Sequence, residues 1–468
     1  MTDETGLRSR QLDEDRNVFI NRTGRFFVST PEFGSRFNSD RLSQQERDWL
    51  HREGHDPRLD LEKHALAFAR AQRKARAGPL QYLILVPTLR CNLACSYCQV
   101  SRTDEKAKGF DWDDATLKVV CEIVANLKVP KAKIEFQGGE PTLRPDLINA
   151  VMEAAPKDID LSFVICTNLQ KISPEIVEIF DRSDVQISTS LDGDIDTHTR
   201  QRLGSNDDAE EFSANLEWLV ERYGPDKISA LPTIDASSLP DIDALIYAYL
   251  SRGLTSIYLR PVNYHGFARK RHPSSISQSE TWSAFHRRFV ETLIRRNWQN
   301  RDVAIEETYL SHVLKRIFRP GVDGHVDLRS PNPMGQDYVV IDFDGKAYPT
   351  DEARMLSRSG VIDLAIGNVH DGWNTPERDA LNAASTNAGD PVCEKCAYQP
   401  YCGRDLIDDI ARYGTVEIPR NETEFCKRHL RLFDLAFELI YDPDEAVQYS
   451  LRRWLGLATD NIELGARV

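Results

Sequence analysis

Three closely spaced cysteines constrain this chain more than any other feature of its sequence. Cys91, Cys95 and Cys98 follow the apolar run 82–86 directly. Thiolates are soft ligands that bind zinc or iron–sulfur clusters. Three protein sulfurs around a four-iron cubane leave one iron open to a small molecule, as a catalytic zinc site keeps a position for water. A structural zinc with a distant fourth ligand and three unrelated buried cysteines are the alternatives.

The composition is that of a globular protein with room for two to four domains in 468 residues. A net charge of −14, from 59 basic and 73 acidic residues, disfavours a nucleic-acid partner and tolerates a basic peptide. We expect no membrane span, because no apolar run approaches the length that one requires. Nine cysteines behind a polar N-terminus favour metal ligation in a reducing cytoplasm over disulfide bonds.

Short β-prone runs alternate with helical patterns through the middle of the chain. The predicted strands are 82–86, 133–136, 161–166, 185–190, 227–232 and 256–260. The predicted helices between them are 116–127, 145–154, 174–182, 209–223 and 240–251. This alternation predicts βαβ units, an α/β fold and a parallel sheet. Ligands bind at the carboxyl ends of the strands in such sheets, so those residues are the candidates for a site.

The spacing of Cys91, Cys95 and Cys98 resembles the CxxxCxxC signature of radical S-adenosylmethionine (SAM) enzymes, with Tyr97 as the aromatic residue before the last cysteine. The resemblance implies a partial (βα)6 radical SAM barrel over residues 80–330. It also implies that these three cysteines hold a [4Fe–4S] cluster and that SAM is bound beside it.

Three further stretches resemble SAM-binding motifs of the same superfamily. Gly138-Gly139-Glu140 resembles the GGE motif, which implies that Glu140 holds the SAM amino group, although a helix-capping acid is the alternative. Asn168 stands where relatives carry Thr-Asn-Gly, but a leucine replaces the glycine after it. Ser190 and Arg202 lie in a stretch that resembles the Ser-Leu-Asp-Gly…His…Arg pattern. Their implied roles are contacts to the ribose hydroxyls and the methionine carboxylate of SAM.

Four cysteines near the C-terminus form a second candidate site. Cys393, Cys396, Cys402 and Cys426 can close a tetrahedral set, for which zinc is a reasonable ion. The region 331–468 resembles the SPASM domain of peptide and protein maturases, which implies an auxiliary [4Fe–4S] cluster. A β-hairpin around Asp344-Gly345 is predicted within it.

This region departs from the SPASM pattern at three cysteine positions. Thr350 and Leu406 occupy two of them, and the fifteen residues before Gly345 contain no cysteine. The four cysteines that remain suffice for one auxiliary cluster. Together with the cluster on Cys91, Cys95 and Cys98, we therefore expect two [4Fe–4S] clusters in total. Asp351 follows Thr350, at the position where related maturases carry a base near the substrate. The resemblance implies that role for Asp351, and a polar turn residue is the alternative.

Residues 1–79 form a separate N-terminal region. Runs 17–20 and 26–28 predict a hairpin, and Ser43 with Glu46 predicts a capping box at the start of a helix. A basic helix is predicted over 60–77. Hairpin plus helices resembles the leader-peptide recognition elements of peptide-modifying enzymes, and a simple packing extension is the alternative.

Four stretches of the chain resemble the His-Xaa-Ser system radical SAM maturases of the HxsB type. They are Leu83–Arg102, Leu259–Lys270, Tyr348–Leu356 and Cys393–Asp405. The resemblance implies a radical SAM enzyme that removes hydrogen from a ribosomally made precursor peptide with a leader and forms a carbon–carbon crosslink, a cyclophane. Thioether formation, side-chain oxidation and a non-catalytic iron–sulfur subunit are the alternatives. The implied partner for reduction is a low-potential flavodoxin or ferredoxin.

Overall fold

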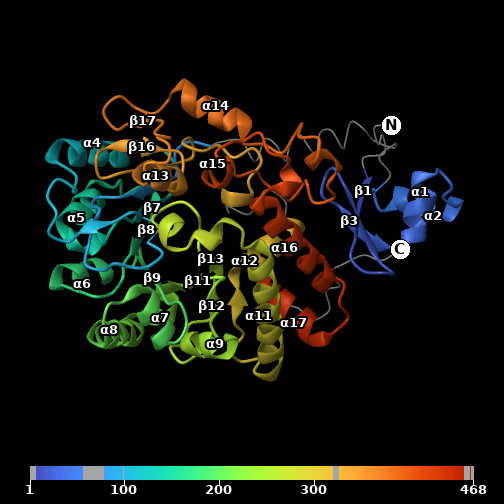
Figure 1. Ribbon diagram of the computed structural model, residues 1–468, viewed down its shortest axis with the longest axis horizontal. Coiled ribbons are helices and arrows are strands. Elements are labelled where there is room, and N and C mark those ends of the chain that lie inside the picture. Colours follow the sequence, from blue (N-terminus) through green and yellow to red (C-terminus); the bar gives the residue numbers. More distant parts are fainter. Residues whose placement is uncertain (1–6, 56–77, 99, 320–325, 458–463, 465–468) are drawn as a thin grey trace.

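The computed structural model describes residues 7–55, 78–98, 100–319, 326–457 and 464, so the helix predicted over 60–77 lies outside the described residues. Figure 1 shows a large α/β body at one end of the long axis and a small N-terminal unit at the other, with α15 and α16 between them. No helix among the described residues is long and apolar enough to cross a membrane.

The body is organised around one sheet with the strand order β10-β9-β8-β7-β4-β15-β16-β17. Its first five strands are parallel neighbours: β4 (Tyr82–Leu85), β7 (Lys131–Phe136), β8 (Asp160–Cys166), β9 (Val185–Ser190) and β10 (Ile228–Leu231). The alternating helices are α4 (Asp114–Ala125), α5 (Pro145–Ala154), α6 (Pro174–Phe180), α7 (Ile195–Arg202), α8 (Asn206–Tyr223) and α9 (Ile242–Leu250). The predicted α/β fold with a parallel sheet is confirmed.

Helix-capping side chains and buried apolar residues explain where these helices begin and how the strands pack. The side chains of Asp113, Ser173 and Ser205 each accept a hydrogen bond from the first turn of a helix, as an N-cap does. Along the central strands, buried residues such as Ile134 and Ile187 belong to the main apolar core. Burial of this apolar surface against the helices holds the strand ends in place.

The sixth strand predicted over 256–260 is interrupted and lies outside the main sheet. Its first part, β12 (Ser256–Ile257), pairs with β14 (Glu306–Glu307). The Leu259 amide donates to the Glu307 carboxylate at 3.4 Å instead of to a neighbouring strand. Pro261, which has no N–H to donate, then lies in β13 (Arg260–Pro261), paired with β11 (Thr233–Ile234).

The predicted C-terminal hairpin is confirmed, and it extends the barrel sheet. β15 (Tyr338–Ile341) runs parallel to β4, and β16 (Lys346–Tyr348) returns antiparallel to it. β17 (Gly367–Asn368) completes this edge. The hairpin leads into α13 (Asp351–Arg358), which the shared sheet brings to the carboxyl ends of the barrel strands. The domain boundary between residues 330 and 331 stays a prediction.

The remaining helices join the C-terminal region to the barrel. α11 (Ser279–Gln299) and α12 (Thr308–Phe318) pack against α16 (Glu424–Ile440) and α17 (Glu445–Trp454). The other short elements are β5 (Arg90–Cys91), β6 (Thr103–Asp104), α10 (Ala268–Arg271), α14 (Pro376–Ala384) and α15 (Leu406–Tyr413), with 3₁₀ turns at 141–143, 225–227, 273–276, 326–328, 393–395 and 420–422.

The N-terminal unit has its own aromatic core. It contains β1 (Leu7–Gln11), β2 (Asn17–Asn21), β3 (Phe26–Ser29), α1 (Pro31–Asn38) and α2 (Gln44–Arg52). The predicted hairpin is β2–β3, and the capping box of Ser43 and Glu46 is present. The polar strand β1 was not predicted. Arg10 on β1 forms an ion pair of 2.6 Å with Asp434 of α16, which attaches this unit to the C-terminal region.

Candidate functional site

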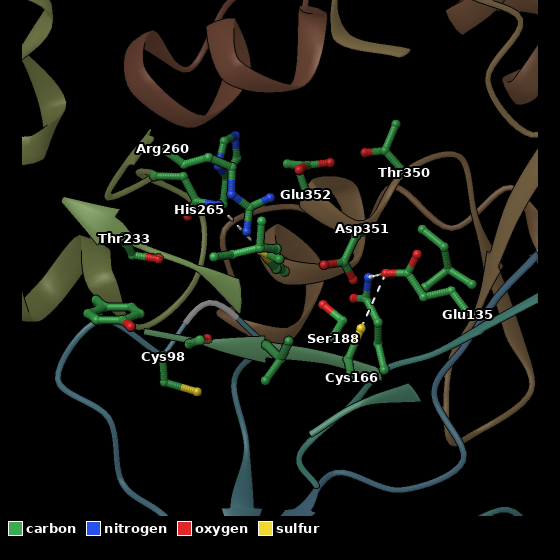
Figure 2. Close-up of a pocket in the computed structure, with 18 of the residues that line it drawn as sticks. Cys98, Glu135, Cys166, Ser188, Thr233, Arg260, His265, Thr350, Asp351 and Glu352 are labelled. Carbon is green, nitrogen blue, oxygen red and sulfur yellow. Dashed lines mark hydrogen bonds between the residues drawn. The ribbon is translucent and has the colours of Figure 1, made fainter. Parts of the chain in front are cut away.

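A cavity of about 600 Å³ opens at the carboxyl ends of the barrel strands (Figure 2). Its lining includes every predicted SAM-site residue: Cys91, Cys95, Tyr97, Cys98, Gly138, Gly139, Glu140, Asn168, Ser190 and Arg202. We call this part the cysteine end. The opposite part, the carboxylate end, is lined by Asp327, Asp351, Glu352, Asp405 and Asp408. The cavity lies in the size range of small-molecule sites.

The two glycines of the Gly-Gly-Glu motif seat the segment that leads into the cysteine loop. The Gly139 amide donates to the Thr88 carbonyl at 3.0 Å, and the Glu140 amide donates to the Arg90 carbonyl at 2.8 Å. A Cβ on Gly139 would lie 2.2 Å from the Arg90 carbonyl oxygen, and one on Gly138 would lie 2.3 Å from that of Thr88. Only glycine permits this close approach of two backbones.

The Glu140 carboxylate links two strand ends. It accepts hydrogen bonds from the Thr142 hydroxyl at 2.7 Å and from the Asn168 amide at 2.7 Å. Burial raises the pKa of Glu140, and these bonds oppose the shift. The carboxylate therefore acts as a structural cap, which was the alternative interpretation, while it also lines the cysteine end.

Arg202 is positioned by the aromatic residue of the cysteine loop. Its guanidinium donates to the Tyr97 hydroxyl at 2.9 Å, and this hydroxyl donates to the Asp192 carboxylate at 2.5 Å. Asp192 is fully buried and also accepts from the Thr233 amide at 2.9 Å. This chain of bonds fixes a guanidinium that lines the cavity and can bind a carboxylate.

Asn168 and Ser190 complete the cysteine end. The Asn168 side-chain amide donates to the Asn92 side chain at 2.8 Å and approaches the Cys91 sulfur at 3.8 Å. Leu169, which replaces the glycine of the related motif, adopts the left-handed conformation that glycine favours, with φ 60°. Ser190 ends β9 and lines the cavity without a recorded hydrogen bond among the described side chains.

The cysteine end fits a metal cluster better than it fits free thiols. Burial raises the pKa of Cys91 to about 12, and the neighbouring Glu140, Cys95 and Cys98 contribute to the shift. Metal ligation requires thiolates, and the positive charge of a metal offsets the cost of placing them together. Three sulfurs on one side of a cavity that also holds Glu140 and Arg202 match a cubane with one iron open to SAM.

The four C-terminal cysteines lie apart from this cavity. The thiols of Cys396 and Cys426 both contribute to the raised pKa of Cys393, so these sulfurs interact electrostatically. Cys402 is affected by the other three in the same way. No group of three or more His, Cys, Asp or Glu side chains among the described residues surrounds a single ion. A cubane is larger than one ion, and its sulfur ligands stand farther apart.

Asp351 and Glu352 face the carboxylate end from the first turn of α13 (Figure 2). The Asp351 carboxylate accepts from Arg354 Nε at 2.8 Å, and Arg354 is fully buried. Thr350, where the related pattern has a cysteine, caps the helix by accepting from the Ala353 amide. The role of Asp351 as a base stays a prediction.

Glu135 lines the cavity but was not found from the sequence. Glu135 on β7 accepts from the Tyr82 hydroxyl at 2.7 Å and from the Cys166 thiol at 3.4 Å, and it pairs with Lys133 at 2.8 Å. The available signal was a carboxylate flanked by two buried apolar residues near the end of a strand. His265 is almost fully buried, and neither of its ring nitrogens has a hydrogen-bond partner among the described residues.

Comparison with known proteins identifies part of the chain. Residues 85–246 match the model of the radical SAM superfamily, so this segment is a radical SAM domain. A cysteine-type anaerobic sulfatase-maturating enzyme of Clostridium novyi is 23% identical over 337 residues, which cover 69% of this chain and 86% of that enzyme.

Two further relatives match over shorter segments. The PqqA peptide cyclase of Gluconobacter oxydans is 38% identical over 77 residues, 16% of this chain and 21% of that protein. An uncharacterized protein of Methanocaldococcus jannaschii is 32% identical over 117 residues, 24% of this chain and 39% of that protein. The chain therefore spans well under half the length of these two relatives.

Two solved structures share the fold. Native anSMEcpe with bound AdoMet superposes with a TM-score of 0.61 at 18% identity and covers 77% of this chain and 97% of its own. Streptococcus suis SuiB bound to the precursor peptide SuiA gives 0.50 at 15% identity, with 90% and 97% covered. At these identities the similarity shows that the fold is shared.

Proposed function

We propose that this protein is a radical SAM enzyme that modifies a ribosomally made precursor peptide. One observation carries the proposal: a single cavity joins the cysteine end to a carboxylate end supplied by the C-terminal region. The first end suits SAM and a [4Fe–4S] cluster, and the second leaves room for a peptide side chain. The proposed cofactors are two [4Fe–4S] clusters, the second on Cys393, Cys396, Cys402 and Cys426, and SAM.

The residues of the cysteine end would bind and orient SAM. Glu140 offers a carboxylate to its amino group, Arg202 a guanidinium to its carboxylate, and Ser190 a hydroxyl to its ribose. When bound, the cluster and SAM supply a 5′-deoxyadenosyl radical, for which a low-potential flavodoxin or ferredoxin would provide the electron. Tyr97 and Asp192 keep Arg202 in place, so the methionine carboxylate of SAM would meet a guanidinium that is already oriented.

The proposed product is a carbon–carbon crosslink between a ring and a side-chain β-carbon, a cyclophane. Its support is the resemblance of four stretches to the HxsB-type maturases, together with the match of 77 residues to a PqqA peptide cyclase. Ring closure of this kind removes two hydrogens from the peptide. One leaves as an atom to 5′-deoxyadenosine, and the other leaves as a proton and an electron.

Oxidation of a single side chain is the second candidate. Its support is the long match to a cysteine-type anaerobic sulfatase-maturating enzyme, which extends over 69% of this chain. This reaction would use the same radical and would change the peptide mass without joining two residues. Thioether formation is a third candidate and would require a cysteine in the substrate.

The N-terminal unit is proposed to bind the leader of the precursor. Its three-stranded sheet has two edges, β1 and β3, and an edge strand can pair with an extended peptide. The unit is fixed to the C-terminal region by the Arg10–Asp434 pair and by the Tyr401 hydroxyl, which donates to the Gly24 carbonyl at 2.6 Å. A bound leader would thus lie at a constant distance from the cavity.

Co-expression with a short precursor encoded nearby tests the function. We expect reduced, reconstituted protein to release 5′-deoxyadenosine from SAM and the peptide to become lighter by two hydrogens. If a crosslink forms, the peptide backbone between the two joined residues should resist fragmentation during mass analysis. If one side chain is oxidised, the peptide should fragment normally along its whole length. Failure to cleave SAM would favour a non-catalytic iron–sulfur subunit.

A further inference from the structure

Two neighbouring carboxylates at the start of α13 face the same cavity, but they differ in what holds them. Arg354 is fully buried and needs a close counter-charge, which Asp351 supplies at 2.8 Å. The next carboxylate, Asp342, lies at 3.7 Å. A proton on Asp351 would remove the charge of the nearer partner and leave the buried guanidinium with the more distant Asp342 alone, which is unfavourable. Asp351 is therefore suited to anchor Arg354.

Glu352 has no such anchor. Its carboxylate accepts a hydrogen bond from its own backbone amide but pairs with no other side chain among the described residues, and Glu352 lines the cavity. Burial, with the charges of Asp327 and Asp351, raises the pKa of Glu352 to about 7. The charged or titratable groups that influence it from the surrounding elements are Arg260 on β13, Asp327 in the 326–328 turn, Tyr338 on β15, Asp351 on α13 and Asp405 before α15.

We propose that Glu352, and not Asp351, accepts the proton that the peptide releases after its radical is formed. This inference rests on the proposed function. The peptide gives one hydrogen atom to the 5′-deoxyadenosyl radical, and the resulting carbon radical bonds to the ring. The ring then loses one electron to an oxidised iron–sulfur cluster and one proton to the Glu352 carboxylate, which restores its aromaticity. Atoms and electrons balance, and Asp351 is a positioning residue that keeps Arg354 and the start of α13 in place.

Both the surroundings of the Glu352 carboxylate and its basicity favour this assignment. An acceptor must reach the proton without breaking a buried ion pair, and Glu352 meets that condition where Asp351 does not. A proton acceptor works best when its pKa lies near the working pH, since it is then both available and basic. The positive charge of Arg260 on β13 stabilises the ionised Glu352 carboxylate before it accepts the proton.

The test compares Glu352→Gln with Asp351→Asn in the full-length, reconstituted protein. The measured quantities are 5′-deoxyadenosine, deuterium transfer from labelled peptide into it, and modified peptide. For Glu352→Gln we expect SAM cleavage and deuterium transfer within about 3-fold of wild type, while peptide product per 5′-deoxyadenosine falls by about 10²–10⁴. For Asp351→Asn we expect a lower melting temperature and an unchanged product ratio. The exposed Glu377→Gln on α14 is the matched control and should behave as wild type.

The pH profile adds a readout that a structural role would not move. In wild type, product per 5′-deoxyadenosine should fall as the pH is lowered through the raised pKa of Glu352, because the acceptor is then already protonated. This fall in product ratio at low pH should be absent in Glu352→Gln. An unchanged product ratio in Glu352→Gln, or uncoupling in Asp351→Asn alone, would overturn the inference. Wild-type protein that leaves the peptide mass unchanged would overturn the proposed function and the inference together.

Discussion

The cysteine end and the carboxylate end belong to one cavity but are assembled differently. At the cysteine end, each motif follows its own barrel strand, and neighbouring strand ends bring the motifs together. Glycine permits the close backbone contacts, as at Gly139. At the carboxylate end, residues from 327 to 408 meet because β15 pairs with β4 across the sheet. No short motif describes that meeting.

The difference shows how sharply each end constrains its ligand. The cysteine end has its polar groups fixed by hydrogen bonds, as Tyr97 fixes Arg202, and so suits one molecule of constant shape. At the carboxylate end, Arg354 holds Asp351 in an ion pair, whereas the neighbouring Glu352 pairs with no other side chain among the described residues.

Removal of one cysteine-end ligand should have the largest effect. Cys95→Ala removes one of three proposed cluster ligands, so SAM cleavage should fall below detection and bound iron should drop by about four per chain. Iron analysis and 5′-deoxyadenosine release measure both outcomes. Cys121→Ala on α4, outside the cavity lining, is the matched control. Persistent SAM cleavage in Cys95→Ala would contradict the assignment of the cysteine end.

Replacement of an auxiliary cysteine should separate SAM cleavage from the later formation of modified peptide. Wild-type protein should hold about eight iron and eight sulfide per chain, from two cubanes. Cys402→Ala should lose about four of each, continue to cleave SAM and fail to deliver modified peptide. A wild-type content near four iron with one bound zinc would favour the zinc interpretation of Cys393, Cys396, Cys402 and Cys426.

A neutral replacement of Glu140 tests the SAM contact. Glu140→Gln keeps the shape and an acceptor oxygen for the Thr142 hydroxyl, but it loses the acceptor for the Asn168 backbone amide and the charge offered to the SAM amino group, so its melting temperature is compared with wild type first. A hydrogen bond to a charged group contributes about 1.5–3 kcal/mol, so the Kd for SAM should rise about 10- to 100-fold. Calorimetry measures the Kd, with the exposed Glu153→Gln as control. Wild-type affinity would show that Glu140 is only the cap seen in the fold.

The smallest effect is expected at Ser190. Ser190→Ala removes one neutral hydrogen bond to the ribose, worth about 0.5–1.5 kcal/mol, so the KM for SAM should rise about 2- to 10-fold. Cluster content and peptide affinity should stay the same. Ser229→Ala on the neighbouring strand β10 is exposed and serves as control. A much larger loss, or none, would place the ribose elsewhere in the cavity.

Local patterns predicted much of the fold. Apolar runs and turn residues predicted five strands of the parallel sheet, the helices between them and two hairpins, because these elements depend on side chains near one another in the chain. The strand predicted over 256–260 is interrupted, because the carboxylate of Glu307, distant in sequence, accepts the hydrogen bond of the Leu259 amide. The strand β1 was missed because its alternating residues are polar, and its position depends on the Arg10–Asp434 pair.

The sequence by itself determined the chemistry of the cysteine end, since the motif residues and their spacing name the groups that meet there. It also named the four auxiliary cysteines, but it could not show which groups surround them. Only the tertiary structure decided how Asp351 and Glu352 differ, because the buried Arg354 selects one of two adjacent carboxylates as its partner. Adjacent residues look equivalent in a sequence, whereas burial and distance in space decide which of them is free to react.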